Sequence, residues 1–320
     1  MIAVIAFGGN ALLRPEDNGT VTEQLHRAND AALWLVPLTH QGYKLVVVHG
    51  NGPQVGNLMI QMEEAATKIP PLPIDVCDAM TEGSMGYLLE TAIQNQFKKM
   101  GKGVRMATIL TPVQVAANDP GFKNPTKPIG PFYTKFRAEQ LTKEFGWTLK
   151  EDAGRGWRKV VPSPKPQKIL NISLIRDILK VRDVVVAGGG GGIPVTVGSD
   201  GIWKGVEAVI DKDYTASLIA QELNADLFII LTGVARVARD FGRPTQKYFS
   251  HITLSEAKSL MAEGQFPAGS MGPKIDSALQ FVEATNKPVL ITDSQTLAMA
   301  LEEKSGTYII KDPPEEEKKK

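Results

Sequence analysis

The sequence has 320 residues, 42% of them hydrophobic, and a formal net charge of +1. This content fills the core of one large domain or two small ones, and the small net charge gives no global attraction to nucleic acid or to an anionic membrane surface. Cys77 is the single cysteine, so no internal disulfide is possible. No apolar run approaches the roughly 18 residues of a membrane span, and the first residues lack the basic region of a signal peptide. We therefore expect a globular, cytoplasmic protein that binds neither nucleic acid nor membranes.

The predicted elements alternate between strands and helices. Residues 2–7 form a short apolar run that ends at two glycines, as a strand buried on both faces does. Apolar residues then recur at helical spacing over 22–38, and Gly42 ends this helix before a second buried strand at 44–48. Further strands are predicted at 106–110, 184–187, 227–231 and 289–292, and another helix at 214–223. This order predicts an α/β fold, an open three-layer α/β/α sandwich around a mainly parallel sheet.

Residues 118–167 break the alternation, because prolines and glycines cluster there and apolar runs are few. Long irregular segments in compact domains are commonly lids or binding elements. We expect a single domain over 1–320 with an inserted, protruding, lid-like subdomain at 118–167, called the lobe below. A solvated insertion without a function is the alternative. Residues 313–320 carry a block of charges and are expected to form a frayed tail.

Three glycine-rich turns follow predicted strands: Gly8-Gly9-Asn10, Gly50-Asn51-Gly52, and the run from Gly188 through Gly189, Gly190 and Gly191 to Gly192. Ligands of open α/β sheets gather at the carboxyl ends of the strands, and backbone N–H groups of such turns bind phosphate oxygens. Each turn alone could be only a tight turn. No GxGxxG or GxxxxGK[ST] motif is present, which argues against a dehydrogenase and a P-loop enzyme.

Three lysines lie in constrained surroundings that fix the direction of their side chains. Lys127 lies in a proline-rich segment, Lys212 lies between Asp211 and Asp213, and Lys274 follows a Gly-Ser-Met-Gly-Pro turn. A lysine in a polar loop is usually only solvated, but phosphoryl transfer needs positioned positive charge. The two aspartates are expected to hold the Lys212 ammonium in place and to keep it charged. The four histidines show no ligand spacing, so no resident metal site is predicted.

These residues bring out a resemblance that covers nearly the whole chain. The chain resembles the carbamate kinases of the wider amino-acid kinase fold. Eight segments match in the family's order: Gly8-Gly9-Asn10-Ala11, His49 to Gly56, Asn124 to Pro131, Glu151 to Arg158, Val161 to Pro164, Gly189 to Pro194, Gly205 to Asp213, and Gly269-Ser270-Met271.

The resemblance implies reversible phosphoryl transfer between ATP and carbamate, with Mg²⁺, giving carbamoyl phosphate and ADP. It also implies ATP synthesis after arginine breakdown as the usual direction, and a homodimer. It places Gly8, Gly9 and Asn10 at the transferring phosphoryl and Gly50, Asn51 and Gly52 at the carbamate. Phosphate binding is also expected at Gly189, Gly190 and Gly191, and nucleotide binding at Lys274, Asp211, Lys212, Gly269 and Ser270. In the catalytic set, Lys212 bridges the leaving and transferring oxygens, Asp211 orients the lysines, and Lys127 completes the set.

Carbamate is an anion at neutral pH, so its oxygen needs no general base before it attacks phosphorus. The chemistry instead needs donors around the equatorial oxygens. His49 either orients the substrate loop or, more simply, packs at a strand end. Related kinases of this fold carry a lysine two residues before the first glycine turn, where this chain has Ala6. We therefore predict that motion of the lobe delivers Lys127 to the site. The alternative is that Lys127 only joins the lobe to the core by a salt bridge.

Three positions depart from the expected pattern. Glu82 stands where glutamine is usual, Pro267 and Ala268 reverse the expected order, and Asp240 lies where asparagine is usual. The last two bear on nucleotide affinity. Two rival functions remain: an acyl-phosphate-forming kinase for an amino acid or its N-acyl derivative, and a non-catalytic binder of carbamoyl phosphate. The rival kinase would need a larger pocket with charge partners for the side chain. A non-catalytic binder could lose any one of four charged residues, so the presence of all four disfavours it: Lys127, Asp211, Lys212 and Lys274.

Overall fold

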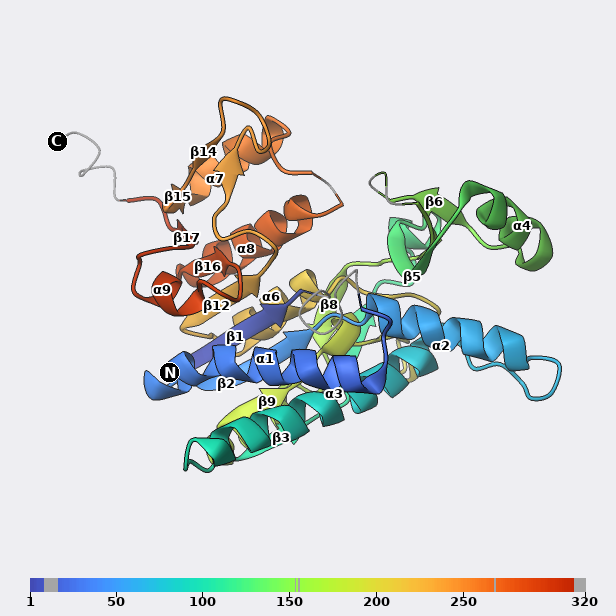
Figure 1. Cartoon of the computed structure of the whole chain (residues 1–320), viewed down its shortest axis with the longest axis horizontal. Helices are drawn as coiled ribbons and strands as arrows, with labels where there is room; N and C mark the ends of the chain where they lie inside the picture. The colour runs from blue at the N-terminus through green and yellow to red at the C-terminus, as the bar shows by residue number, and fades with distance from the viewer. Residues whose placement is uncertain (9–16, 153, 155, 268, 314–320) are drawn as a thin grey trace.

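The computed structural model describes residues 1–8, 17–152, 154, 156–267 and 269–313. The predicted tail therefore lies outside the described residues, except for Pro313. The largest sheet that they form has eight strands (Figure 1). Their spatial order is β15 (His251–Thr253), β17 (Thr307–Ile310), β16 (Val289–Thr292), β12 (Leu227–Leu231), β1 (Ile2–Phe7), β2 (Lys44–His49), β9 (Val184–Val186) and β3 (Met106–Thr108). All neighbouring pairs are parallel except β16 with β17.

The sheet is buried on both faces because its central strands are continuously apolar. Val4 and Ala6 of β1 point to one face, whereas Ala3, Ile5 and Phe7 point to the other. The first face packs against α5 (Ile172–Val181), α6 (Lys212–Glu222), α7 (Leu254–Ala262) and α8 (Met271–Thr285). The second packs against α1 (Val21–His40), α3 (Ile74–Lys99) and α9 (Leu297–Leu301). The predicted three-layer α/β/α sandwich is confirmed.

Smaller sheets lie beside the main one. One has the order β11 (Trp203–Gly205), β10 (Ile193–Val197), β4 (Pro112–Val115) and β8 (Pro166–Ile169), and a two-stranded ribbon pairs β13 (Ala238–Arg239) with β14 (Lys247–Tyr248). A short 3-10 helix, η2 (Pro120–Phe122), precedes the sheet of the lobe, and another, η3 (Gly189–Gly191), precedes β10.

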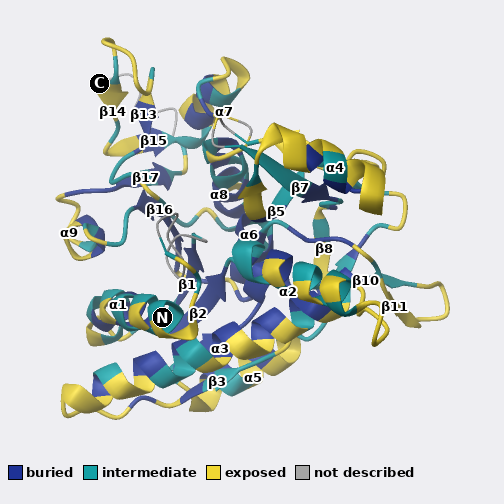
Figure 2. Ribbon diagram, turned by 45° about the vertical axis from the view of Figure 1, so that its right-hand side comes forward, coloured by how far each residue is buried: buried dark blue, intermediate teal, exposed yellow. Residues whose placement is uncertain are grey.

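The lobe contains its own three-stranded antiparallel sheet, in the order β5 (Lys127–Tyr133), β7 (Trp157–Val161) and β6 (Leu149–Glu151). Helix α4 (Lys135–Phe145) connects β5 to β6, and most of its surface is exposed (Figure 2). These elements, green in Figure 1, stand out from the main sheet above α2 (Gly52–Ala65). Strand β8 begins inside the predicted lobe but pairs with β4 outside it, so the boundaries at 118 and 167 remain a prediction.

Helix α2 supports the lobe through close contacts. A Cβ built on Gly56 of α2 would lie 2.0 Å from the Cα of Gly130 in β5, so two glycines let the backbones touch. Farther along α2, Glu63 accepts a hydrogen bond of 2.8 Å from the Trp147 indole and lies 3.4 Å from the Lys159 ammonium. That ammonium also lies 3.8 Å from the centre of the Trp147 ring. The lobe therefore packs directly on α2 at both a backbone and a side-chain contact.

Candidate active site

A cavity of about 1010 Å³ lies at the carboxyl edge of the main sheet. Gly8 follows β1, Gly50 follows β2, Thr232 follows β12 and Asp293 follows β16, and all four line it. The lobe contributes Lys127 and Arg158, so the cavity lies between the lobe and the sheet. This is the place where open parallel sheets bind ligands.

Two buried lysines share one carboxylate in this cavity. Asp213 accepts a hydrogen bond of 2.7 Å from Lys212 Nζ through Oδ1 and another of 2.7 Å from Lys274 Nζ through Oδ2. Lys212 and Asp213 belong to the first turn of α6, and Lys274 belongs to the first turn of α8. The Asp213 side chain is 3% exposed, which leaves its charge with these two ammonium groups rather than with water.

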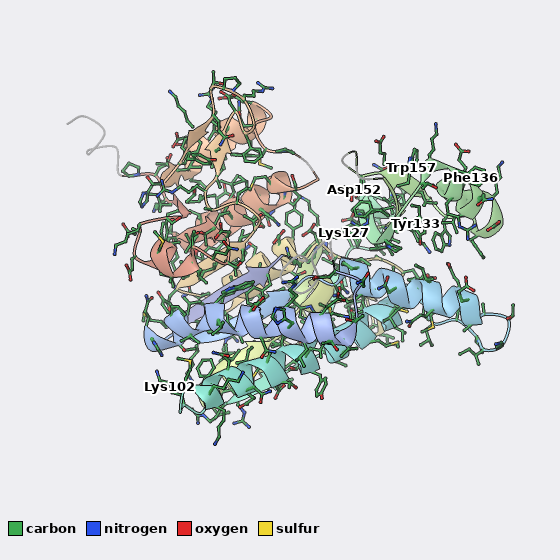
Figure 3. The ribbon with its side chains drawn as sticks, in the orientation of Figure 1. Lys102, Lys127, Tyr133, Phe136, Asp152 and Trp157 are labelled. Carbon is green, nitrogen blue, oxygen red and sulfur yellow. The ribbon has the colours of Figure 1, made fainter. Side chains whose placement is uncertain are left out.

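Asp211 connects this pair to the lobe. It is the N-cap of α6, and its Oδ1 accepts the backbone N–H of Asp213 at 3.0 Å, as expected for aspartate at this position. Its Oδ2 accepts a hydrogen bond of 2.7 Å from Lys127 Nζ, at the start of β5. Figure 3 labels Lys127 at the junction of the lobe and the body of the molecule. The four charged residues expected in the site thus lie together, and Asp213 is the shared partner that sequence reasoning did not include among them.

Burial and pairing act in opposite directions on these groups. Burial, aided by the nearby Lys274, lowers the pKa of Lys212 to about 8, although Asp213 and Asp211 counteract it. The ammonium therefore stays mostly charged at neutral pH, although desolvation leaves its pKa below that of a solvated lysine. Burial also disfavours the Asp213 carboxylate, but Lys212 and Lys274 together hold its pKa well below the usual range. Lys274 behaves oppositely to Lys212: burial lowers its pKa, but Asp213 raises it by more.

The glycine turns differ in how they meet the cavity. Gly50, Asn51 and Gly52 line it, as do Gly269 and Ser270 before α8. In the turn from Gly188 to Gly192, only Gly190 lines it. All of Gly189, Gly190 and Gly191 are buried, and Gly189 and Gly191 pack away from the cavity: a Cβ on Gly189 would meet His49 Nε2 at 2.3 Å, and one on Gly191 would meet the Ile210 carbonyl at 2.2 Å. Of the first turn, Gly8 lines the cavity, whereas Gly9 and Asn10 lie outside the described residues.

Comparison with known proteins agrees with this arrangement. Residues 1–293 match the amino acid kinase family. The chain belongs to the amino acid kinase family. It is 44% identical to the carbamate kinase of Thermococcus kodakarensis over 312 residues, which is 97% of this chain and 99% of that protein. It is 45% identical to carbamate kinase 1 of Enterococcus faecium over 311 residues, or 96% and 98% of the two chains.

Solved structures give the same result for this amino acid kinase. Carbamate kinase from Giardia lamblia bound to citric acid has a TM-score of 0.93 at 41% identity, covering 97% of this chain and 98% of that one. The same enzyme bound to AMP-PNP has a TM-score of 0.88 at 41% identity, with the same coverage. The predicted family and fold are therefore confirmed over nearly the whole chain.

The structure also shows the surroundings of His49 and of Ala6, the position where related kinases carry a lysine. His49 is fully buried at the end of β2 and does not line the cavity, and burial lowers its pKa to about 4. The structure thus favours a neutral, packed histidine. Ala6 is fully buried in β1 on the face that packs against α6. Lys127 already reaches Asp211 in this structure, so no lobe motion is needed to form that ion pair.

The departures from the family pattern lie in different surroundings. Glu82 is 2% exposed on α3 and accepts the Thr111 backbone N–H at 2.8 Å, so it lies behind the turn that contains Gly189. Asp240 does not line the cavity, and its backbone N–H donates to Gln265 at 2.9 Å. Ala268 lies outside the described residues. Within the described residues, no helix is both long and apolar enough to cross a membrane.

Proposed function

We propose that the chain catalyses reversible phosphoryl transfer between ATP and carbamate, giving ADP and carbamoyl phosphate. The observation that carries this proposal is the cluster of Lys127, Asp211, Lys212 and Lys274 in a cavity lined by glycine turns. Similarity to carbamate kinases over 96–97% of the chain supports it. ATP synthesis after arginine breakdown is consistent with this reaction.

In this reaction the protein does not need to form a covalent intermediate or to remove a proton from carbamate. The carbamate oxygen is already anionic, so the site needs cations and N–H donors that bring two anions together. In the proposed arrangement, Lys212 bridges the leaving and transferring oxygens and Lys274 contacts the nucleotide phosphates. Asp213 holds both of these ammonium groups by hydrogen bonds of 2.7 Å, and Asp211 holds Lys127 Nζ at the same distance. The turns at Gly8 and Gly50 present backbone N–H groups to the transferring phosphoryl and the carbamate.

Lys127 makes the lobe part of the site. Its ammonium would leave Asp211, or share it, to contact the transferring phosphoryl, and its side chain is 25% exposed and therefore accessible to a ligand. We propose that the segment 118–167 acts as a lid that closes on both substrates. Arg158, which lines the cavity from β7, is a further lobe cation near Gly52: a Cβ there would lie 3.9 Å from its Nη2.

Mg²⁺ fits this site as a companion of the nucleotide. The carboxylate oxygens of Asp211 and Asp213 are all engaged in hydrogen bonds, so they form no separate metal cage. Within the described residues, no group of three or more His, Cys, Asp or Glu side chains is placed to hold a metal ion. Protein-bound Mg²⁺ commonly takes phosphate oxygens and waters with one or two carboxylates. Asp211, on the cavity wall, is the residue that would complete its ligands through Oδ2 once Lys127 leaves or shares that oxygen, and the ion would neutralise phosphate charge.

One assay tests the function and separates it from its rivals. ATP formation from ADP and carbamoyl phosphate, with Mg²⁺, is coupled to a reporter enzyme. The expected result is rapid ATP formation, with acetyl phosphate a poorer donor. Equal or faster ATP formation from N-acetylglutamyl phosphate would indicate the rival acyl-phosphate kinase, and binding without turnover would indicate a carbamoyl phosphate binder. The homodimer is a separate proposal, and sedimentation that shows only monomer at micromolar concentration would contradict it.

A further inference from the structure

Helix α3 carries two buried carboxyl groups one turn apart, behind the cavity. Asp78 is fully buried and Glu82 is 2% exposed. Neither lines the cavity, and neither has a lysine or arginine in hydrogen-bond contact among the described residues. Burying a carboxyl group that no cation contacts by a hydrogen bond is costly, so the polar contacts of these two groups have to offset that cost.

Asp78 holds the turn that follows β2. Its Oδ1 accepts a hydrogen bond of 2.8 Å from Asn51 Nδ2, and the same nitrogen donates to Thr81 Oγ1 at 2.8 Å. Both amide hydrogens of Asn51 are thus directed to α3, and the side chain is 2% exposed. Asn51 lies between two glycines that line the cavity, so α3 sets the position of the turn proposed to bind carbamate.

Glu82 holds the other turn through Thr111. Its Oε2 accepts the Thr111 backbone N–H at 2.8 Å, and the Thr111 hydroxyl accepts the Gly188 backbone N–H at 2.7 Å. Glu82 also touches the turn itself, because a Cβ on Gly189 would lie 3.2 Å from its Cγ. The two carboxyl groups therefore reach the two turns, one each.

The turns also pack on each other. A Cβ built on Gly190 would lie 2.2 Å from Asn51 Nδ2, so the Asn51 amide lies directly against the Gly190 backbone. Asn51 and Gly190 both line the cavity. A shift of either turn would change the separation of the N–H groups that a bound acyl phosphate meets.

We propose that Asp78 and Glu82 are positioning residues that fix the separation of the 50–52 and 188–192 turns around the acyl phosphate. This inference rests on the proposed function for its substrate. Burial raises the pKa of both carboxyl groups well above the usual range, so it favours the neutral form more than in a solvated carboxyl group. Asp78 Oδ2 and Glu82 Oε1 have no hydrogen-bond partner among the described residues. A neutral amide could therefore replace either acid, whereas an apolar side chain could not.

The test compares amide and apolar replacements at both positions. Asp78→Asn and Glu82→Gln keep the acceptor oxygen, whereas Asp78→Leu and Glu82→Leu remove it. We expect the leucine variants to lose roughly tenfold or more in kcat/KM for carbamoyl phosphate, the scale of a lost buried hydrogen bond. The KM for ADP of the leucine variants should change by less than about threefold. The amide variants should keep kcat/KM for carbamoyl phosphate within about threefold of wild type.

Glu90→Leu is the matched control. Glu90 lies two turns farther along α3 and accepts a hydrogen bond of 3.0 Å from the Thr108 hydroxyl, away from the cavity. This variant should leave both kinetic constants unchanged. If the leucine variants of Asp78 and Glu82 do not fold, Thr81→Val and Thr111→Val remove single hydroxyl partners of the same network. They should raise the KM for carbamoyl phosphate selectively.

Hydrogen exchange gives a second measurement that does not depend on the reaction. Amides of residues 50–52 and 188–192 should exchange faster in the leucine or valine variants, but not in Glu90→Leu. Unchanged exchange and unchanged kcat/KM would overturn the inference. Amide variants as impaired as leucine variants would also overturn it, because the acceptor role would then not explain the loss. If wild type makes no ATP from carbamoyl phosphate while exchange responds as expected, the proposed function fails and the role of α3 in positioning the turns stands.

Discussion

Lys212 is the residue whose change should be most informative for catalysis. Its ammonium is buried, lies 2.7 Å from Asp213 and faces the cavity from the first turn of α6. Donors that stabilise charge in a transition state typically contribute about 2.7–4 kcal/mol, so Lys212→Ala should lower kcat by roughly 10²–10³. The KM for ADP should rise by less. Asp213 keeps Lys274 as a partner in this variant, so the melting temperature should change little.

The pH dependence gives a sharper form of the same prediction. A lysine with a pKa of about 8 is charged in most molecules at pH 7, in half of them near pH 8 and in few at pH 9. If the charged form is the active one, kcat/KM should fall about tenfold between pH 7 and pH 9, since this constant reports the free enzyme. Arginine stays charged in this range, so any residual activity of Lys212→Arg should lack this alkaline decline.

These measurements use the coupled assay for ATP formation from ADP and carbamoyl phosphate, over pH 6.5 to about 9.5, with the coupling enzymes in excess. Lys204→Ala is a suitable control, because Lys204 is an exposed residue of β11 outside the cavity. Its kinetic constants should match wild type. A loss of activity under about threefold in Lys212→Ala would refute the assigned role of this ammonium, given the size expected for such a donor.

Three further results are expected. Lys127→Ala should lower kcat by about 10² with a nearly unchanged melting temperature, measured by the same assay and by calorimetry, whereas near-normal turnover would leave Lys127 as a structural link only. Nucleotide with carbamoyl phosphate should protect residues 118–167 from proteolysis if the lobe closes, and equal cleavage with and without ligands would argue against a lid. Gly56→Ala should destabilise the contact with Gly130 by about 1–3 kcal/mol, because the added methyl overlaps the facing backbone, and a melting temperature equal to wild type would contradict that contact.

The central fold could be predicted because its signals are local. Six strands of the main sheet, including 2–7 and 227–231, are continuous apolar runs next to glycine or helix signals, and the structure has all six. Strands β15 and β17 were not predicted. They have three and four residues, which is too short for a clear apolar run. Whether such short segments form strands depends on tertiary contacts that a local pattern does not contain.

The site residues that could be predicted are likewise those with a local sequence signal. Lys127, Lys212 and Lys274 stood out because proline, glycine or carboxylate neighbours constrain them, and the structure places them around one cavity. The sequence does not predict the burial of Asp78 or Glu82, since an acidic residue within a helix usually faces water. Their burial follows from how α3 packs under the turns. The spacing of 78 and 82 would have placed both on one helix face, but nothing in the sequence shows that this face is buried.

The shared carboxylate of Asp213 has a consequence for the balance of the reaction. Lys212 and Lys274 bond to Asp213, while Lys127 bonds to Asp211, so these five groups form one ionic cluster. Moving a phosphoryl group between ADP and carbamate only redistributes negative charge between the two ligands and leaves their sum unchanged. The protein therefore meets the same total ligand charge before and after transfer, and any electrostatic preference for one pair of ligands depends only on how its cations are placed around them. The flow through the enzyme would then follow the concentrations of its reactants, as a freely reversible catalyst requires.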